Sequence, residues 1–275
     1  MDKKLIFLDI DGTLTEGGSN VPPDSALKAI RAAQKNGHKV FLCTGRNKAM
    51  LAPLLQYDFD GYVASAGGYV VCGEDVIYDH PMTKEQYETA IGLLHKHDVV
   101  CTVETLDYSY GDDNLEVLLG ESGESNSELL RWKRAINENL SVLPFKEYKG
   151  EPVYKIVTMM RDISQIDEAK AALDAEFDFC MFNMEKFAIA NGEMINRDFD
   201  KGQGVEKICK FLNHPIEDTI GFGDSMNDRA MIETVGVSVC MEDGSEMLKE
   251  ISDLTTAPLN EDGIYKAFEA LGLLA

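Results

Sequence analysis

Two aspartates, Asp9 and Asp11, directly follow a short apolar run and lie two residues apart. Side chains two residues apart on an extended backbone project to the same side, so these carboxylates repel each other. A divalent cation between them would relieve the repulsion, because hard cations take oxygen ligands. Gly12 lets the backbone turn away and leaves room for a ligand. The alternative is an ordinary strand end followed by an Asp-Gly turn.

Three further polar clusters lie next to expected elements. The segment Thr44-Gly45-Arg46 follows an apolar run. Its hydroxyl and backbone N–H groups could bind an anion, although Thr44 could equally cap a helix. Lys201 opens an expected helix. Asp224 ends an expected strand, and Asn227 and Asp228 follow it at the i+3 and i+4 spacings that bring side chains together.

Short apolar strands alternate with helix patterns at both ends of the chain, which predicts an α/β fold with a parallel sheet. Loops at the carboxyl ends of such strands build the ligand site. The expected strands are 5–8, 40–43, 62–64, 219–223 and 236–239. The expected helices are 24–37, 47–56, 202–212, 226–235, 245–251 and one that begins at 263.

The middle of the chain has a different, α+β order, which predicts a second module inserted into the first. We expect residues 1–81 and 196–275 to form one domain and residues 82–195 the inserted one. The expected helices of the inserted module are 83–96, 127–139 and 164–175, and its expected strands are 99–104, 115–119, 153–159, 179–183 and 187–190. Four of its polar residues are expected at the surface, namely Glu104, Tyr108, Arg131 and Lys186.

The composition excludes several classes of partner. The net charge of −22, from 48 acidic and 26 basic residues, repels nucleic acid and anionic membranes. No apolar stretch is long enough to span a bilayer, and the first residues do not resemble a signal peptide. The six cysteines include no Cys-x-x-Cys pair and fit a reduced, cytoplasmic protein. We expect a small anionic partner and a monomer or weak homodimer.

The five histidines are too dispersed for a metal cluster of their own. His95 and His97 are close in sequence, but residues two apart on a helix do not share a face. Both are expected at the surface.

The polar clusters, taken in chain order, resemble the four motifs of the haloacid dehalogenase (HAD) superfamily of phosphotransferases. The matching segments are Asp9-Ile10-Asp11-Gly12-Thr13-Leu14, Thr44-Gly45-Arg46, Lys201-Gly202 and Gly223-Asp224-Ser225-Met226-Asn227-Asp228. The inserted module resembles the type IIB cap of the Cof-like phosphatases in size, position and αβ pattern. The segment Ala66-Gly67-Gly68-Tyr69 departs from that group, which commonly has Asn-Gly-Ala here.

The resemblance implies a chemistry. Asp9 is the expected nucleophile, which attacks phosphorus to give an aspartyl-phosphate. Asp11 is the expected general acid and base. Mg²⁺ is expected to bind Asp9, the backbone carbonyl of Asp11, and Asp224, and to let carboxylate and phosphate approach each other.

The remaining motif residues are expected to bind phosphate or to position other groups. Lys201 would neutralise Asp9 and the phosphoryl group, and Thr44 would bind its oxygens. Asp228 would orient Lys201 or a metal-bound water from outside the ligand set. The expected phosphate-binding residues are Ile10, Gly12, Thr44, Gly45, Lys201 and Asn227.

The resemblance therefore implies a Mg²⁺-dependent phosphatase for a small phosphate monoester, with a sugar phosphate favoured. A phosphosugar mutase would use the same chemistry with another hydroxyl as acceptor. A phospho-receiver signalling module also combines a parallel sheet, acidic residues and Mg²⁺, but the expected role of Asp11 and the large insertion argue against it. A non-catalytic binding protein on this fold is the third alternative.

Overall fold

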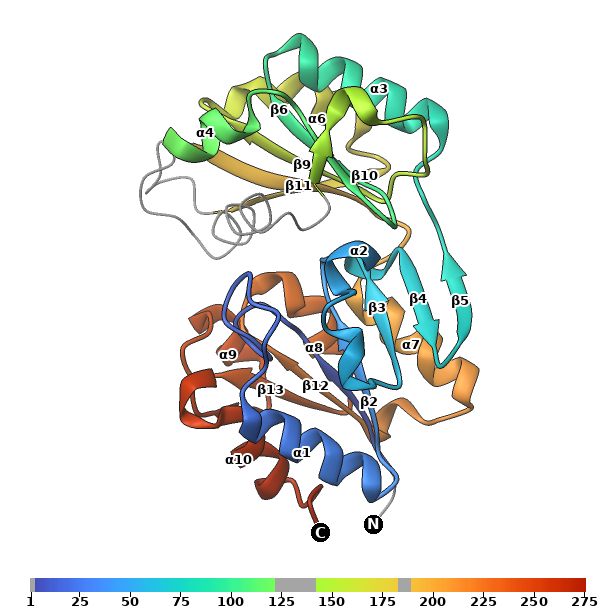
Figure 1. Cartoon of the computed structure of the whole chain (residues 1–275), viewed down its shortest axis with the longest axis vertical. Helices are drawn as coiled ribbons and strands as arrows, with labels where there is room; N and C mark the ends of the chain where they lie inside the picture. Colours follow the sequence, from blue (N-terminus) through green and yellow to red (C-terminus); the bar gives the residue numbers. More distant parts are fainter. Residues whose placement is uncertain (1–2, 122–141, 183–188) are drawn as a thin grey trace. The chain divides into compact units, whose positions relative to one another are not determined.

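The computed structural model describes residues 3–121, 142–182 and 189–275 (Figure 1). The chain divides into two compact units, which we name the core unit and the cap unit. The core unit comprises Met1–Arg46, Leu51–Asp79 and Phe199–Ala275, and the cap unit comprises Asn47–Met50 and His80–Asp198. The sequence did not indicate that residues 47–50 belong with the inserted module.

A sheet with the strand order β14-β13-β12-β1-β2-β3-β4-β5 forms the centre of the core unit. Strand β1 (Leu5–Leu8) pairs in parallel with β12 (Thr219–Gly223) and with β2 (Lys39–Cys43). All four residues of β1 are buried, as expected for a continuous apolar strand covered on both faces. Leu8 lies level with Phe222 and Leu42, so the residues after these strands leave the sheet at one edge.

The outer strands complete this sheet on both sides. Parallel pairing continues through β13 (Val237–Met241) to β14 (Leu254–Thr256), and from β2 to β3 (Gly61–Ala64). Beyond β3 the direction reverses, because β4 (Tyr69–Cys72) and β5 (Asp75–Asp79) form antiparallel pairs. The sequence did not predict this hairpin. Strand β5 has no buried residue, so its pattern lacks the apolar run that marks the central strands.

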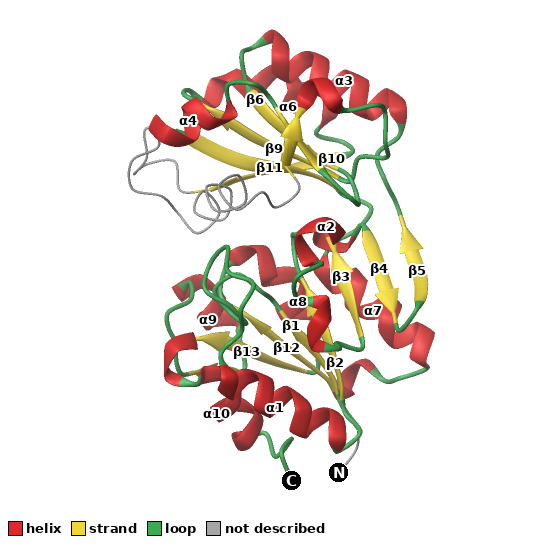
Figure 2. Ribbon diagram, in the orientation of Figure 1, coloured by secondary structure: helices red, strands yellow, loops and turns green. Residues whose placement is uncertain are grey.

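Helices pack on both faces of this sheet (Figure 2). Their bounds are Asp24–Lys35 for α1, Lys201–Leu212 for α7, Arg229–Thr234 for α8, Glu246–Ile251 for α9 and Gly263–Ala270 for α10. Helix α1 packs against α10 and β2, whereas α7 packs against α8 and the strands β3 to β5. Phe7 of β1 belongs to the same apolar cluster as Val205 and Ile208 of α7. Within the described ranges, no helix combines the length and the apolar character that crossing a membrane requires.

A second sheet, with the order β10-β11-β9-β6-β7-β8, forms the cap unit. Its strands are β6 (Val100–Glu104), β7 (Ser109–Gly111), β8 (Val142–Pro144), β9 (Lys155–Met160), β10 (Phe177–Phe182) and β11 (Ala190–Asn196). Its helices are α2 (Lys48–Leu51, with Leu51 in the core unit), α3 (Lys84–Lys96), α4 (Leu115–Glu121) and α6 (Asp167–Leu173). Leu94 of α3 and Leu173 of α6 share one apolar cluster with Val103 and Ile156, so these two helices cover one face of the sheet.

The prediction of a strand at 115–119 was wrong, because this segment begins helix α4. Its first, fourth and fifth residues are buried while Val117 is 60% exposed, which is the helical spacing rather than strand alternation. The predicted surface position of Glu104 was also wrong, since this residue is fully buried. Tyr108 is exposed as expected. Helix 127–139, Arg131, Lys186 and all but the end of strand 187–190 lie outside the described residues.

Candidate active site

Three polar residues leave the core sheet at the same edge. Asp9, Thr44 and Asp224 directly follow the parallel strands β1, β2 and β12. The backbone N–H of Asp9 donates to Phe222 O at 3.0 Å and that of Thr44 to Val63 O at 2.9 Å, so sheet bonding continues to the first site residues. This edge is where open parallel sheets bind ligands.

Lys201, the first residue of α7, joins two carboxylates at this edge. Its Nζ donates to Asp9 Oδ1 at 2.7 Å and to Asp228 Oδ1 at 2.5 Å. All three side chains are at most 5% exposed. Burial alone would lower the pKa of Lys201, but the carboxylates of Asp228 and Asp9 raise it well above its ordinary value. The lysine therefore stays charged between its two partners.

A third carboxylate belongs to the same group. Oxygen atoms of Asp9, Asp224 and Asp228 lie within 4.8 Å of one another. Asp228 Oδ2 accepts the backbone N–H groups of Asp224 at 3.1 Å and Ser225 at 3.2 Å, which fixes the turn after β12. Burial and repulsion from Asp228 raise the pKa of Asp9 to about 7, and burial with Asp228 and Asp9 raises that of Asp224 to about 9.

This group fits a divalent cation. Three carboxylates share a buried space with one lysine, and burial and mutual repulsion raise the pKa values of Asp9 and Asp224, so one lysine does not compensate all the negative charge there. Mg²⁺ prefers such oxygen donors. The Asp228 carboxylate lies within 4.8 Å of the other two and bonds to Lys201, and its expected place outside the ligand set stays a prediction.

Gly12 makes the tight turn beside Asp224. Its φ is +96°, and a Cβ there would lie 2.5 Å from Asp224 Oδ2. Its backbone N–H donates to Thr15 O at 2.8 Å, so this expected phosphate-binding group is engaged within the loop. The carbonyl of Ile10 accepts the N–H groups of Thr13, Leu14 and Thr15. Only glycine at position 12, which has no side chain, allows the Asp224 carboxylate to lie this close to the backbone of the turn.

Asp11 is held by Arg46, whose pairing the sequence did not predict. Arg46 Nε donates to Asp11 Oδ2 at 2.8 Å and Nη2 to Oδ1 at 2.6 Å, a bidentate ion pair. Gly18 N also donates to Oδ1 at 2.6 Å, and Arg46 Nη1 donates to Asn20 Oδ1 at 2.7 Å. Arg46 is only 3% exposed. The arginine directly after Thr44-Gly45 was the one sequence signal for this ion pair. Its partner could not be read from the sequence, because the pairing depends on how the loop of residues 15–20 folds.

Thr44 and Asn227 differ in how they are placed. Thr44 is buried, and its Oγ1 accepts the N–H of Arg46 at 3.1 Å, so its hydroxyl proton remains for another acceptor. Gly45, between them in sequence, is half-buried. Asn227 is exposed, and its Oδ1 accepts Ser225 Oγ at 3.0 Å. Within the described part of the chain, Asn227 makes no hydrogen bond to the acidic group.

The segment that departs from the Asn-Gly-Ala pattern is held by its backbone. Ser65, Ala66 and Gly67 have φ values of 49°, 57° and 114°. The N–H groups of Ser65 and Ala66 donate to Arg46 O and Thr44 O, at 2.8 and 3.0 Å. A Cβ on Gly67 would lie 2.2 Å from the carbonyl oxygen of Asp200, the residue before Lys201. Backbone groups of this loop thus hold the Thr44 segment, and no side chain at position 66 is needed for it.

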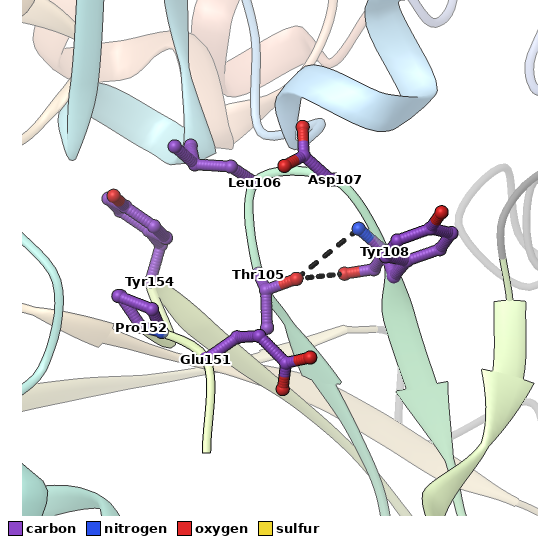
Figure 3. A pocket seen from close by; sticks show the side chains of 7 residues that line it. All are labelled: Thr105, Leu106, Asp107, Tyr108, Glu151, Pro152 and Tyr154. Atoms are coloured by element: carbon purple, nitrogen blue, oxygen red, sulfur yellow. Dashed lines mark hydrogen bonds between the residues drawn. The ribbon is translucent and has the colours of Figure 1, made fainter. Parts of the chain in front are cut away.

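A pocket of about 290 Å³ in the cap unit is a separate candidate (Figure 3). It is lined by Thr105, Leu106, Asp107, Tyr108, Glu151, Pro152 and Tyr154. Thr105 Oγ1 donates to Tyr108 O at 2.8 Å and accepts its N–H at 3.2 Å, which shapes the loop. The lining includes two carboxylates, and the ammonium group of Lys48 lies 3.6 Å from one of them, Asp107 Oδ1.

The side chain of Asn47 explains why residues 47–50 belong to the cap unit. Its Nδ2 donates to Thr105 O at 2.9 Å and to Ser109 Oγ at 3.1 Å. The N–H of Ala49 donates to Leu106 O at 2.8 Å. The chain therefore passes from the Thr44 segment directly into a segment anchored on the cap loop 105–109.

Known proteins match the chain over nearly its whole length. The family model of haloacid dehalogenase-like hydrolases matches residues 6–268. The chain is 31% identical to the "Putative phosphatase YkrA" of Bacillus subtilis (strain 168), with 100% of both chains covered. It is 28% identical to the "5-amino-6-(5-phospho-D-ribitylamino)uracil phosphatase YitU" of the same organism, with 95% of each covered.

Solved structures give the same result. The HAD subclass IIB sugar phosphatase BT4131 matches with a TM-score of 0.76 and 26% identity, over 98% of this chain and 100% of that one. A hypothetical protein from Geobacillus kaustophilus HTA426 matches with a TM-score of 0.80 and 23% identity, over 99% and 100%, and supports the fold alone. The predicted fold class, a parallel-sheet α/β core with an inserted α+β cap, is confirmed. The chain belongs to the haloacid dehalogenase-like hydrolase family.

Proposed function

We propose that this protein is a Mg²⁺-dependent phosphatase that hydrolyses a small phosphate monoester, with sugar phosphates as the favoured class. The observation that supports this most directly is the buried group in which Lys201 joins Asp9 to Asp228, with Asp224 beside them. Its negative charge calls for a metal ion, and its lysine supplies a cation for a phosphoryl group. The names of relatives, which include a sugar phosphatase, point the same way.

In this proposal Asp9 attacks phosphorus, and the alcohol leaves as the aspartyl-phosphate forms. Asp9, the carbonyl of Asp11 and Asp224 would hold Mg²⁺, which would supply positive charge between the carboxylate and the phosphate. Lys201 favours the ionised form of Asp9 and neutralises the transferring group. The side chain of Asp11 gives a proton to the leaving oxygen and then takes one from the water that opens the intermediate.

Arg46 has a positioning role in this mechanism. Its bidentate pair with Asp11 fixes the orientation of that carboxylate and occupies both of its oxygens, so one of these bonds has to break before Asp11 can carry a proton for the leaving oxygen. Thr44 and the N–H of Gly45 bind phosphoryl oxygens. Ile10, Gly12 and Asn227 remain predicted phosphate contacts. The cytoplasmic location, the small phosphorylated partner and the monomeric or weakly dimeric state also remain predictions.

The test is a phosphate-release screen with and without Mg²⁺. Its substrates are sugar phosphates, nucleotides, pyridoxal phosphate, flavin mononucleotide and 5-amino-6-(5-phospho-D-ribitylamino)uracil, the last because relatives are named for it. We expect Asp9→Asn to lose turnover by at least about 10⁴-fold. The matched control Asp75→Asn changes an exposed aspartate of β5 and should keep full activity. Equal release by Asp9→Asn would remove this residue from the mechanism.

The same reactions distinguish the alternatives on this chemistry. A mutase would form a phosphosugar isomer faster than it releases phosphate. A phospho-receiver would hold the phosphoryl group for minutes to hours, whereas a phosphatase should turn the phosphoenzyme over rapidly. The reaction is stopped with acid, and the amounts of acid-stable phosphate and of protein-bound phosphate are measured. These two amounts distinguish the mutase, the phospho-receiver and the phosphatase.

A further inference from the structure

The cap unit contains a second cluster of metal-ligating side chains, and its residue types differ from those of the acidic group in the core unit. It consists of His95 at the end of α3, Cys101 in β6 and Asp112 just after β7. Ligand atoms of the three side chains lie within 4.8 Å of one another. We propose that His95, Cys101 and Asp112 form a binding site for a transition-metal ion, with Zn²⁺ as the best-matched ion.

Two of the three ligands are fixed by the backbone before any metal binds. The N–H of Cys101 donates to Asp112 Oδ2 at 2.8 Å, and the N–H of Asp112 donates to Cys101 O at 3.0 Å. The second of these bonds continues the antiparallel backbone pairing of β6 with β7 by one step, and the first ties the Asp112 side chain to the backbone at that step. The thiol and the carboxylate are therefore held side by side before a metal ion binds, so binding costs these two residues little further conformational entropy.

His95 completes the cluster from the adjacent helix. Its Nε2 lies 3.0 Å from Asp112 Oδ2, and its ring packs edge-on against Phe145 with the ring centres 5.5 Å apart. The nitrogen that would bind the metal thus already faces the other two ligands. Nearby His97 instead pairs with Glu168, so the two histidines have different partners, as their spacing on the helix requires.

The donor set selects the kind of ion. One nitrogen, one sulfur and one carboxylate oxygen suit Zn²⁺, whose sites with three protein ligands keep a fourth position for water. Mg²⁺ would not take the thiol. Ligand atoms around one Zn²⁺ lie about 3.5 Å apart, so distances within the cluster need to shorten by at most about 1.3 Å. The metal would replace the His95–Asp112 hydrogen bond, and the thiol proton would leave to solvent as the sulfur–metal bond forms.

Access and burial are also suitable. The side chains of His95 and Asp112 are 37% and 16% exposed, whereas Cys101 is buried. An ion can enter from the side of His95 and meet a sulfur atom that is shielded from oxidants. The bound ion would tie the end of α3 to the β6–β7 pair and so stabilise the cap unit.

The test uses the full chain in excess Mg²⁺, titrated with Co²⁺ and then with Zn²⁺. We expect one Co²⁺ per chain to give a thiolate-to-metal absorption band that Zn²⁺ abolishes. Cys101→Ser should remove the band, and His95→Gln should weaken Zn²⁺ binding by about tenfold or more. The controls Cys180→Ser, at an exposed cysteine, and His97→Gln should change neither.

Two further arms make the result decisive. Asp224→Asn should keep the band, because the acidic group of the core unit has no part in it. His95→Gln removes no core volume, so it decides the question even where Cys101→Ser fails to fold. A wild-type protein without a thiolate band, or a band that survives His95→Gln at unchanged affinity, would overturn the proposal.

Discussion

Each unit buries one lysine between two carboxylates, and the two triads differ in where they lie in their sheets. In the cap unit, Lys155 Nζ lies 3.3 Å from Glu104 Oε2 and also bonds to Glu193 Oε1. These residues come from the three neighbouring strands β6, β9 and β11, and Lys155 is directly opposite Glu104 in the register. The cap triad is thus assembled across the sheet by strand pairing alone.

The core triad is assembled from chain ends instead. Asp9 follows a strand, Lys201 begins a helix and Asp228 closes a turn, all at the edge where the parallel strands end. Asp224 then adds a third carboxylate to the core group, within 4.8 Å of the other two. The excess negative charge at an open strand edge is what calls for a cation and a substrate.

The largest expected effect comes from removing each lysine. Lys201→Met should lower kcat/KM by at least about 10²–10³-fold, because the transferring phosphoryl group loses its cation. Lys155→Met should instead lower the free energy of unfolding by about 3–5 kcal/mol, since two buried carboxylates lose their partner. The folded fraction of Lys155→Met should keep most of its kcat. Urea unfolding and steady-state kinetics on both variants measure the two effects.

Added Mg²⁺ should increase the difference between Lys201→Met and Lys155→Met. It should recover part of the stability lost in Lys201→Met, because a cation can compensate the remaining core carboxylates, and none of that lost in Lys155→Met. If folded Lys155→Met lost as much kcat/KM as Lys201→Met, the cap triad would have to act in the reaction and the distinction between the triads would be wrong.

A smaller effect is expected from two glycines that both have positive φ. Gly12 has φ +96° and no space for a Cβ, which would lie 2.5 Å from Asp224 Oδ2. Gly73, in the turn between β4 and β5, has φ +61° and nothing within 4 Å of such a Cβ. Both alanine variants carry backbone strain of about 1–2 kcal/mol. Only Gly12→Ala should also displace Asp224 and lower kcat, by about 10²-fold.

Gly73→Ala is the matched control for that experiment, because it introduces the same strain away from the acidic group. Activity assays over a range of Mg²⁺ concentrations should show a raised Mg²⁺ requirement for Gly12→Ala alone. An equal loss of kcat in both variants would mean that general destabilisation, rather than the position of Asp224, limits the reaction.

The sequence predicted the part of this site that depends on local pattern. The apolar run 5–8 and the carboxylates after it mark a buried strand and its carboxyl end, because both are read from neighbouring residues. It did not predict that Arg46 pairs with Asp11, since that bond joins two loops 35 residues apart. The side chain of Glu104 was misplaced for the same reason, because its partner Lys155 comes from a strand far along the chain.

Whether a segment forms a helix or a strand was also hard to predict where its apolar run is short. The segment 115–119 has an apolar pattern that fits a buried strand or one side of a helix, and packing decided for the helix α4. Strand β5 exists because β4 pairs with it, although its own residues are exposed or half-buried. Non-local pairing supplies what these local patterns lack.

The smallest expected effect is a pH dependence of stability that the metal-free core carboxylates produce. The pKa values of Asp9 and Asp224, ordinarily 3.8, rise to about 7 and about 9 in the folded protein. Between the unfolded value of 3.8 and these raised values the folded state holds protons that the unfolded chain has lost, so stability falls as pH rises from about 4 to 9. Melting scans in a chelator should show Tm falling by a few degrees over this range, and Mg²⁺ should raise Tm more at pH 8.5 than at pH 5.5, because it binds the ionised carboxylates. Asp224→Asn removes one of the two groups and should flatten the slope. Parallel curves for this variant and the wild type would show that the crowded carboxylates do not set the pH dependence.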